Sequence, residues 1–310
     1  MTVGEVSPPD LAAQAGRAGV LLNTGPFVIH LQTPLPLVVE AVRFLYHDFA
    51  LDEDGGLADF HVRVAQPAGL RRWWRPQAVV QFDGLMPFAP LPLAMAVPML
   101  EWSLNWCAAT YAHHYVMMHA GVVERSGRAL ILPGAPRSGK STLCAALIHR
   151  GWRLLSDEFA LLRPEDARLA PWPRPVSLKD GAIEVIRAFV AGAPIGPPVG
   201  DTLKGTVAHM RPPSDSVERA RETARAAWII FPTYQAGAST RLAPLPKSRA
   251  FFRLADNSHN YDSMGLAGFE TLASVIETCD AYEFTYSDLD EAVTLFDSLE
   301  PPGAPDAQGS

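Results

Sequence analysis

A glycine-rich segment near the middle of the chain constrains the fold more than any other feature. Residues 134–142 read Gly-Ala-Pro-Arg-Ser-Gly-Lys-Ser-Thr, and positions 134–141 match the pattern G-x-x-x-x-G-K-[ST]. An apolar run at 128–133 precedes the segment, and the run at 143–149 has the apolar spacing of a helix. A strand, a glycine-bounded loop and a helix in this order form a phosphate-binding loop, which belongs to α/β folds.

The residue types in this segment, called the phosphate loop from here on, explain the chemistry it offers. Its members are Gly134, Ala135, Pro136, Arg137, Ser138, Gly139, Lys140, Ser141 and Thr142. Successive backbone N–H groups and the positive end of the following helix dipole attract a polyphosphate. We expect Lys140 to reach the β- and γ-phosphates and the Ser141 hydroxyl to bind Mg²⁺. The sequence therefore predicts a nucleotide-binding protein.

Composition excludes several other classes of protein. The formal net charge of −7 argues against a general nucleic-acid binder, whose surface should be basic. The three cysteines show no metal-ligand spacing, so we interpret them as buried thiols of a reducing compartment. No signal peptide is visible, and the longest apolar run, 88–100, contains three prolines and is too short to span a bilayer. We expect a cytoplasmic protein without a nucleic-acid or membrane partner.

The length of 310 residues allows two domains. The helical spacing at 37–46 and the alternating runs at 60–64 and 78–82 indicate a small mixed domain before the phosphate loop. The predicted organisation is a flexible lead-in at 1–18, a small α+β domain at 19–90, a connecting helix at 91–114, a nucleotide-binding domain at 115–300 and a disordered tail at 301–310.

Two adjacent carboxylates are the first candidates for chemistry beyond phosphate binding. Asp157 and Glu158 end the apolar run at 151–158, which reads as a strand. Carboxylates at the carboxyl end of a strand next to a phosphate loop lie where ligands bind in such sheets. Adjacent residues on a strand face opposite ways, so one is expected to hold Mg²⁺ and the other to accept a proton from an attacking hydroxyl. His119, inside the apolar strand at 116–124, reads from its spacing alone as a core histidine.

These residues together resemble a known family of kinases. The run from 119 to 158 resembles the catalytic core of HPr kinase/phosphorylase, a serine kinase related in fold to phosphoenolpyruvate carboxykinase. That family has a His-Gly-rich strand, the phosphate loop, a helix ending in Arg-Gly and an Asp-Asp pair. The counterparts here are His119-Ala-Gly121, residues 134–141, Arg150-Gly151 and Asp157-Glu158, at matching intervals.

The resemblance implies a fold and a set of roles. It implies an α/β protein whose domain at 115–300 is a P-loop kinase core of the HPr kinase/phosphoenolpyruvate carboxykinase type, with ATP and Mg²⁺ as cofactors. It also implies that Asp157 is the general base and that His119 lies near the catalytic carboxylate. Glu158 stands where the second aspartate of the family helps to hold Mg²⁺, so Ser141 and Glu158 are the expected metal ligands.

The resemblance to HPr kinase/phosphorylase is weaker after Glu158. The family carries a metal-associated glutamate and an arginine in its next strand, where this chain has Ser177 and Lys179, so the resemblance does not by itself imply the phosphorolysis that the family also performs. The whole chain is similar to the HPr-kinase-related kinase A proteins, through Arg-Pro-x-Ser-Leu-Lys at 174–179 and Lys-Gly-Thr-Val-Ala-His at 204–209. This similarity implies a serine acceptor on a peptide or small protein, a peptide-chaperone partner and a homo-oligomer.

Basic residues after position 170 are the candidates for contacts with the acceptor. Lysine or arginine there would offset phosphoryl charge in a loose transition state. A Pro/Gly-rich stretch at 193–205 is expected to be a mobile loop, and the basic residues that follow it suit a clamp on the acceptor. The candidates are Arg174, Lys179, Lys204, His209, Arg211 and His259.

The predicted function is an ATP-dependent kinase that transfers the γ-phosphate to a hydroxyl, with the serine acceptor taken from the resemblance. One alternative is a small-molecule kinase that acts on a sugar or another alcohol. Another is a nucleotide-switched binding protein with weak ATPase activity, in which Asp157 and Glu158 serve only as a Mg²⁺ site. Asp157 follows Lys140 by only 17 residues, whereas the acidic strand of motor ATPases comes much later in the chain.

Overall fold

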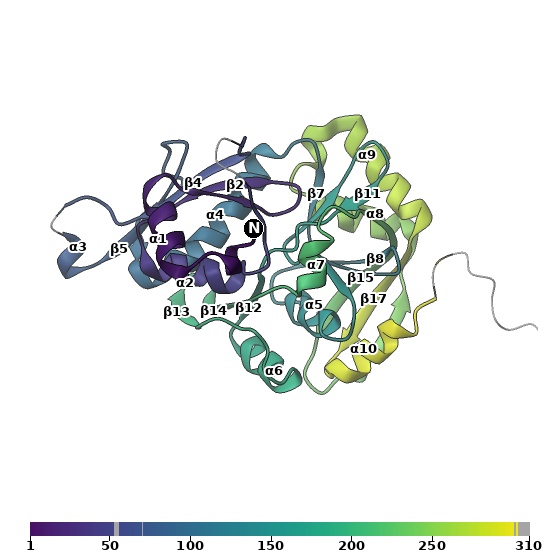
Figure 1. The fold of residues 1–310 in the computed structure, drawn as a ribbon. Coiled ribbons are helices and arrows are strands. Elements are labelled where there is room, and N and C mark those ends of the chain that lie inside the picture. The colour runs from purple at the N-terminus through teal and green to yellow at the C-terminus, as the bar shows by residue number, and fades with distance from the viewer. Residues whose placement is uncertain (53–55, 70, 301, 303–310) are drawn as a thin grey trace, which may run out of the picture. The chain divides into compact units, whose positions relative to one another are not determined.

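The computed structural model describes residues 1–52, 56–69, 71–300 and 302 (Figure 1). These residues form two compact units. Unit 1 comprises 1–112, 173–187 and 192–221, and unit 2 comprises 113–172, 188–191 and the chain from 222 onward. The chain is thus a mixed α/β protein with several sheets. The predicted tail at 301–310 lies, apart from Pro302, outside the described residues.

Unit 1 is built around a six-stranded sheet in the order β3-β1-β2-β4-β5-β6. Helices α2 and α4 pack against each other, and α4 also packs against β4 and β5. In β4 the burial alternates, so that Phe60, Val62 and Val64 face the core. The elements are η1 (Val3–Glu5), α1 (Pro8–Arg17), β1 (Val20–Asn23), β2 (Val28–Gln32), α2 (Pro36–Leu45), β3 (Leu51–Asp52), β4 (Phe60–Ala65), α3 (Arg71–Trp74), β5 (Gln77–Phe82), β6 (Leu91–Pro92), η2 (Leu93–Met95) and α4 (Ala96–Tyr111).

The first residues of the chain are ordered, which corrects the expectation of a flexible lead-in at 1–18. The side chain of Ser7 accepts a hydrogen bond from the Asp10 N–H and caps α1, whose first turn begins with proline. Leu11 and Ala15, one turn apart, are buried. The Pro/Ala/Gly-rich composition of residues 1–18 predicts a loose segment. The helix was missed because its cap and its single buried stripe are short signals.

Unit 1 also contains residues that the sequence assigned to the nucleotide-binding domain. A three-stranded sheet in the order β12-β14-β13 is formed by β12 (Val176–Lys179), β13 (Val199–Thr202) and β14 (Gly205–Met210). The stretch predicted as a mobile loop at 193–205 therefore contains a strand, and its Ile195 bridges to Met210. Helix α6 (Gly181–Phe189) lies between β12 and β13 in the chain, and α7 (Ser214–Glu218) follows β14. The predicted domain at 115–300 differs from the observed units for this reason.

Unit 2 is built around an eight-stranded sheet in the order β11-β10-β7-β8-β15-β17-β16, with β9 also paired to β7. Strands β8, β15 and β17 are parallel neighbours, and β11 also pairs with the start of β15. The elements are β7 (Val116–Arg125), β8 (Arg128–Pro133), α5 (Lys140–Ile148), β9 (Arg153–Ser156), β10 (Phe159–Leu162), β11 (Arg168–Ala170), β15 (Ala224–Tyr234), β16 (Arg241–Pro244), α8 (Lys247–Asp256), α9 (Tyr261–Thr278), β17 (Asp280–Tyr286) and α10 (Leu289–Asp297).

Helices cover both faces of the unit 2 sheet, with α5 and α10 on one side and α8 and α9 on the other (Figure 1). Helix α5 is buried on nearly all sides, as its apolar composition requires. The strand, turn and strand predicted at 116–132 are confirmed as β7 and β8, joined at Ser126 and Gly127. Both turn residues have positive φ, of 54° and 79°, as a tight two-residue hairpin turn requires.

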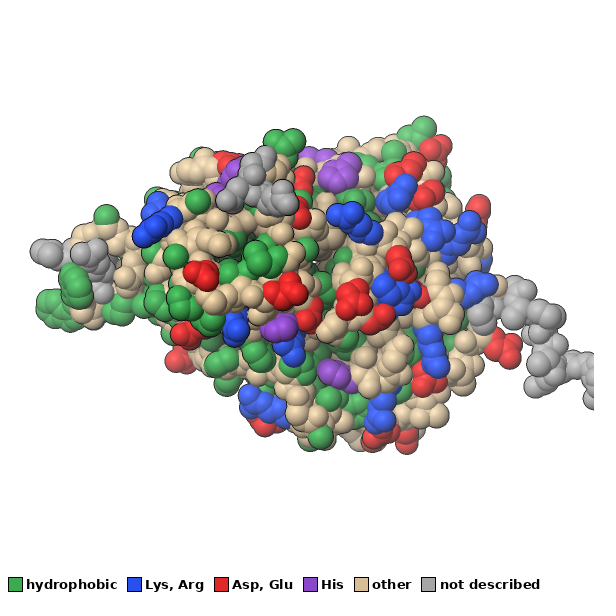
Figure 2. Space-filling model, viewed as in Figure 1, with side chains coloured by type: hydrophobic (Ala, Val, Ile, Leu, Met, Phe, Trp, Pro, Cys, Tyr) green, Lys and Arg blue, Asp and Glu red, His purple; other side chains and the backbone are tan. Residues whose placement is uncertain are grey.

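Two further features concern the charge of the surface and the length of the helices. On the part of unit 2 visible in Figure 2, basic and acidic side chains are interspersed rather than gathered by sign. Among the described residues, no helix is long and apolar enough to cross a membrane.

Candidate active site

The phosphate loop connects β8 to α5 in unit 2. Gly134 has φ of 150°, Arg137 has φ of 69° and Gly139 has φ of 97°, so the backbone repeatedly enters a region that favours glycine. Gly139 is the N-cap residue of α5 and has no side chain to cap the helix. The N–H groups of the first turn of α5 therefore lack a side-chain acceptor from their cap and can bind an anion.

Lys140 begins α5 and folds back over the phosphate loop. Its Nζ donates to the carbonyl oxygens of Gly134 at 2.6 Å and Ala135 at 2.9 Å. The residue is only 6% exposed. The ammonium group is thus held inside the loop by two neutral carbonyls, and a phosphate oxygen would be a stronger partner for it because that pair is charge-assisted.

Two tyrosines that the sequence analysis missed fasten the phosphate loop to the neighbouring strands. The buried hydroxyl of Tyr286, at the end of β17, donates to the Gly139 carbonyl at 3.2 Å. The backbone N–H of Tyr234, at the end of β15, donates to the Ser138 carbonyl at 3.1 Å. Burial raises the pKa of Tyr286 well above its usual value, with smaller contributions from Tyr234 and Cys144, so its hydroxyl remains a donor. The sequence feature that could have pointed to them is the tyrosine at the end of each of the two strands.

Asp157 and Glu158 lie between β9 and β10, because β9 ends at Ser156 rather than at 158 as predicted. The end of β9 and the whole of β10 pair with β7 in one register, since Ser156 is opposite Val122 and Phe159 is opposite His119; the earlier part of β9 is shifted by one residue. They are therefore one path along β7, interrupted where the two carboxylates stand. The Ser156 Oγ accepts a hydrogen bond from the Phe159 N–H at 3.1 Å and stabilises this interruption.

Asp157 faces the helix that begins with Lys140. Burial raises the pKa of the Cys144 thiol on α5; the charge of Asp157 raises it further, and the charge of Lys140 opposes both effects. A Cβ added to Gly121 would lie 2.4 Å from the Cys144 Sγ and 3.9 Å from the Asp157 carbonyl oxygen. Asp157 itself is only 4% exposed. Asp157 therefore lies beside β7 and close to α5, the helix that begins with Lys140.

Glu158 has different neighbours from those of Asp157. Its Oε2 lies 3.7 Å from the Nδ1 of His119, so this histidine is a direct neighbour of the Glu158 carboxylate. The ring of His259 lies 6.3 Å from that of His119, edge to face, and 4.9 Å from that of Phe159. Burial lowers the pKa of His259, and the charge of Glu158 opposes this shift. The structure therefore groups His119, Glu158 and His259.

The predicted metal ligands, Ser141 and Glu158, are both oxygen donors in unit 2. A hydroxyl and a carboxylate suit Mg²⁺, which is commonly held by one or two protein oxygens together with phosphates and water. In the described part of the chain, no group of three or more histidine, cysteine, aspartate or glutamate side chains is arranged to hold a metal ion by itself. Oxygen donors of this kind fit a magnesium ion that phosphate oxygens also bind.

Arg174 belongs to unit 1 and lies in a buried network there. Its guanidinium donates to the Glu101 Oε2 at 3.0 Å and to the Asn105 Oδ1. The Glu101 Oε1 also accepts a hydrogen bond from the Tyr46 hydroxyl at 2.7 Å. Because Arg174 is 5% exposed, this placement favours a structural role over the predicted contact with phosphoryl charge.

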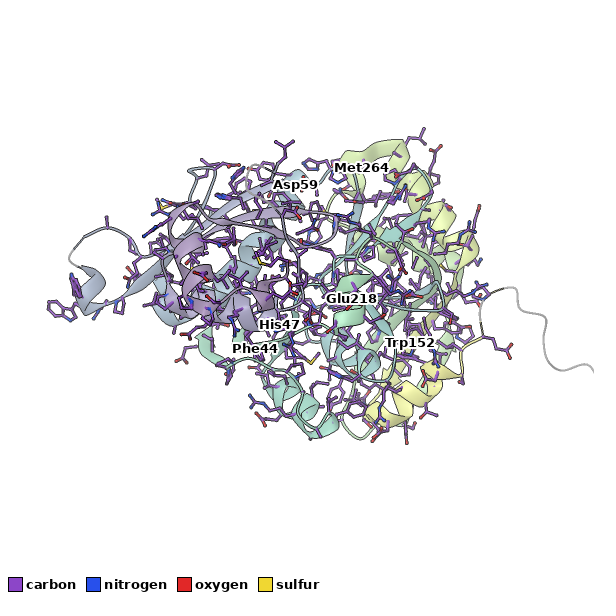
Figure 3. All side chains as sticks on the ribbon, viewed as in Figure 1. Phe44, His47, Asp59, Trp152, Glu218 and Met264 are labelled. Atoms are coloured by element: carbon purple, nitrogen blue, oxygen red, sulfur yellow. The ribbon has the colours of Figure 1, made fainter. Side chains whose placement is uncertain are left out.

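The other basic candidates of unit 1 are spread over its small sheet. The Lys204 Nζ lies 5.4 Å from the centre of the Trp102 ring. The Arg211 guanidinium lies 5.6 Å from the centre of the ring of Phe44, which is labelled in Figure 3. His209 is buried and lines a cavity of about 400 Å³ together with Phe44. Lys179 ends β12 and is partly exposed. His259 is thus the one acceptor candidate that lies in unit 2 with the phosphate loop.

Comparison with known proteins leaves the function to be argued from the site. No family model and no curated protein matches the chain. The structure is similar to that of the Hpr(Ser) kinase/phosphatase from Coxiella burnetii, with 13% sequence identity and a TM-score of 0.26, over 59% of this chain and 92% of that chain. The fold and the site define a mixed α/β protein that carries the phosphate loop sequence between a strand and a helix.

Proposed function

We propose that the protein is an ATP-dependent phosphotransferase that moves the γ-phosphate to a hydroxyl, the serine of a peptide or small protein. The observation that carries this proposal is the position of Asp157. Asp157 is 4% exposed, and its carbonyl oxygen and the Sγ of Cys144, on the helix that begins with Lys140, both lie close to Gly121 of β7. A general base next to a polyphosphate site is the arrangement that phosphoryl transfer needs, since that reaction depends mainly on positioning and charge.

Each residue of the site has a role in this proposal. The phosphate loop and the start of α5 bind the triphosphate, and Lys140 turns from its two carbonyls to the phosphate oxygens. Ser141 and Glu158 would hold Mg²⁺, which neutralises charge on the phosphates when it is bound. Asp157 accepts the proton of the acceptor hydroxyl. His119, whose Nδ1 lies 3.7 Å from the Glu158 Oε2, positions that carboxylate.

The serine acceptor rests on the likeness of 174–179 and 204–209 to the HPr-kinase-related kinase A proteins. A peptide acceptor needs a surface beyond the phosphate site. The partly exposed basic side chains of Lys179 and Arg211 in unit 1 are the candidates to contact an acidic or polar peptide. A peptide-chaperone partner that presents the acceptor is part of the proposal, as is a homo-oligomer.

Incubation with γ-labelled ATP and Mg²⁺ tests the proposal. Three reactions run in parallel, with a serine-containing peptide pool, with a pool of sugars and small alcohols, and with no acceptor. We expect label on peptide serine, and none when Lys140→Ala replaces the wild-type protein. Label on small alcohols would replace the peptide acceptor by a metabolite. Release of inorganic phosphate alone in all three reactions would favour a nucleotide-switched binding protein.

A further inference from the structure

An exposed aromatic ring stands beside the phosphate loop. Tyr234 is 52% exposed and is the last residue of β15, in which residues 226–232 are buried. Its backbone is fixed to the loop through the bond to Ser138. A Cβ added to Gly139 would lie 3.3 Å from the Cβ of Tyr234. The Cβ that carries the ring is therefore within van der Waals distance of the Gly139 position, at the N-terminus of α5.

The orientation of this ring is set by a neighbour. Its centre lies 5.6 Å from that of the Tyr286 ring, at an interplanar angle of 71°. Edge-to-face pairs of this kind are favourable, and here the supporting ring is itself buried and bonded to Gly139. Tyr286 thus holds both the loop carbonyl and the exposed ring, so the ring is preorganised rather than free to fold away.

The position of Tyr234 is the one a nucleobase needs. Strands β8, β15 and β17 are parallel, so the phosphate loop and both tyrosines lie at the same edge of the sheet, where ligands bind. A base is joined to its phosphates through a single ribose and must lie near the loop. An exposed ring at that place offers a stacking surface, and stacking accepts every base because each has a π-face.

We propose that Tyr234 is the stacking platform for the base of the nucleotide and that Tyr286 is the positioning residue that holds the platform and the phosphate loop together. This inference rests on the proposed nucleotide binding and adds to it the residue that stacks on the base. Because stacking does not distinguish bases strongly, the site takes ATP and GTP with similar affinity.

Comparing ATP with inorganic tripolyphosphate separates the base from the phosphates. Affinities are measured by calorimetric titration, in the presence of Mg²⁺, for the wild type, Tyr234→Ala and Tyr234→Phe. We expect Tyr234→Ala to weaken ATP and GTP by roughly tenfold or more while tripolyphosphate binds as before. Tyr234→Phe keeps the ring and should retain the wild-type affinities. Phe252→Ala removes a ring that is 69% exposed on α8 and serves as the control.

Tyr286→Phe tests the second half of the inference. It removes only the hydroxyl bond to Gly139, so we expect it to weaken ATP and tripolyphosphate by the same factor. Unchanged ATP affinity in Tyr234→Ala would overturn the platform, and so would an equal loss for ATP and tripolyphosphate. If the wild type binds neither compound, the proposed function itself fails. Binding of tripolyphosphate with no effect of Tyr234 sinks this inference alone.

Discussion

His259 shows how far the environment of a residue decides its chemistry. Its place in the sequence, between polar residues before a helix, gives no sign of burial or of its neighbours. In the structure the backbone N–H of His259 donates to the Met117 carbonyl, so that the chain just before α9 lies against β7. The ring of His259 meets that of His119 edge to face. Burial lowers the pKa of the imidazole because it disfavours the charged form, and the charge of Glu158 limits that shift.

The lowered pKa of His259 makes folding stability depend on pH. The unfolded histidine titrates near 6.5, so below that pH the unfolded chain binds more protons than the folded one. The stability is complete above about pH 6.5 and is lost as the pH falls through the folded pKa. We expect the urea midpoint to fall on acidification, and to fall less in His259→Gln.

The matched control for this experiment is His113→Gln, at an exposed histidine outside the helix-packed core. It should follow the wild-type pH profile. If the profile of His259→Gln superimposes on that of the wild type between about pH 7.5 and 5.5, the burial argument for this histidine is wrong.

At the scale of elements, the sequence predicted best where periodicity and turn chemistry agreed. The hairpin of β7 and β8 was predicted from an apolar alternation around Ser126-Gly127, and the phosphate loop from its glycines. The end of β9 was placed too late, because the run through Asp157 continues as strand-like sequence into β10. The break depends on the hydroxyl of Ser156, which a pattern of apolar residues does not report.

Gly139 tests whether the loop conformation is required. An alanine there would need φ near 97° and would place its Cβ 2.2 Å from the Tyr286 hydroxyl oxygen. Gly151 has a similar φ of 93° but nothing within 4 Å of an added Cβ. Both substitutions cost about 1–2 kcal/mol for the left-handed backbone. We expect Gly139→Ala to destabilise the protein more than Gly151→Ala and to abolish ATP binding, as measured by urea unfolding and titration.

Gly151→Ala is the control for the cost of placing alanine in a left-handed backbone conformation, and it should bind ATP normally. The account of the loop would be contradicted if the two alanine variants lost the same stability and bound ATP with the same affinity.

At the scale of the whole molecule, the division into two units was the least predictable property. The sequence placed Arg174 in the same domain as the phosphate loop because it follows that loop in the chain. The structure instead pairs it with Glu101 in α4, which is 73 positions earlier. A contact of this separation leaves no local pattern. The acceptor residues were therefore assigned by order along the chain and by resemblance, and these do not report which unit a residue joins.

Removing Arg174 tests whether it is structural. Arg174→Met would leave the buried carboxylate of Glu101 without its cation, and both side chains are only 6% exposed. Breaking one partner of such a pair costs about 3–5 kcal/mol. We expect that loss in urea unfolding, with ATP affinity at the wild-type level when the protein is folded.

Arg187→Ala is the matched control, since Arg187 and Glu184 form an exposed pair whose loss should cost less than about 1 kcal/mol. Wild-type stability of Arg174→Met together with weakened ATP binding would return Arg174 to the phosphate site.

The most direct measurement compares ATP affinity and phosphate transfer at saturating ATP for Asp157→Asn, with Asp256→Asn at the exposed end of α8 as the control. Asparagine keeps the shape of the side chain and removes only its capacity to take a proton. The account predicts affinity within about twofold of the wild type and a transfer rate lower by a factor of about 100 to 10,000. Transfer by Asp157→Asn at a near-normal rate would contradict it.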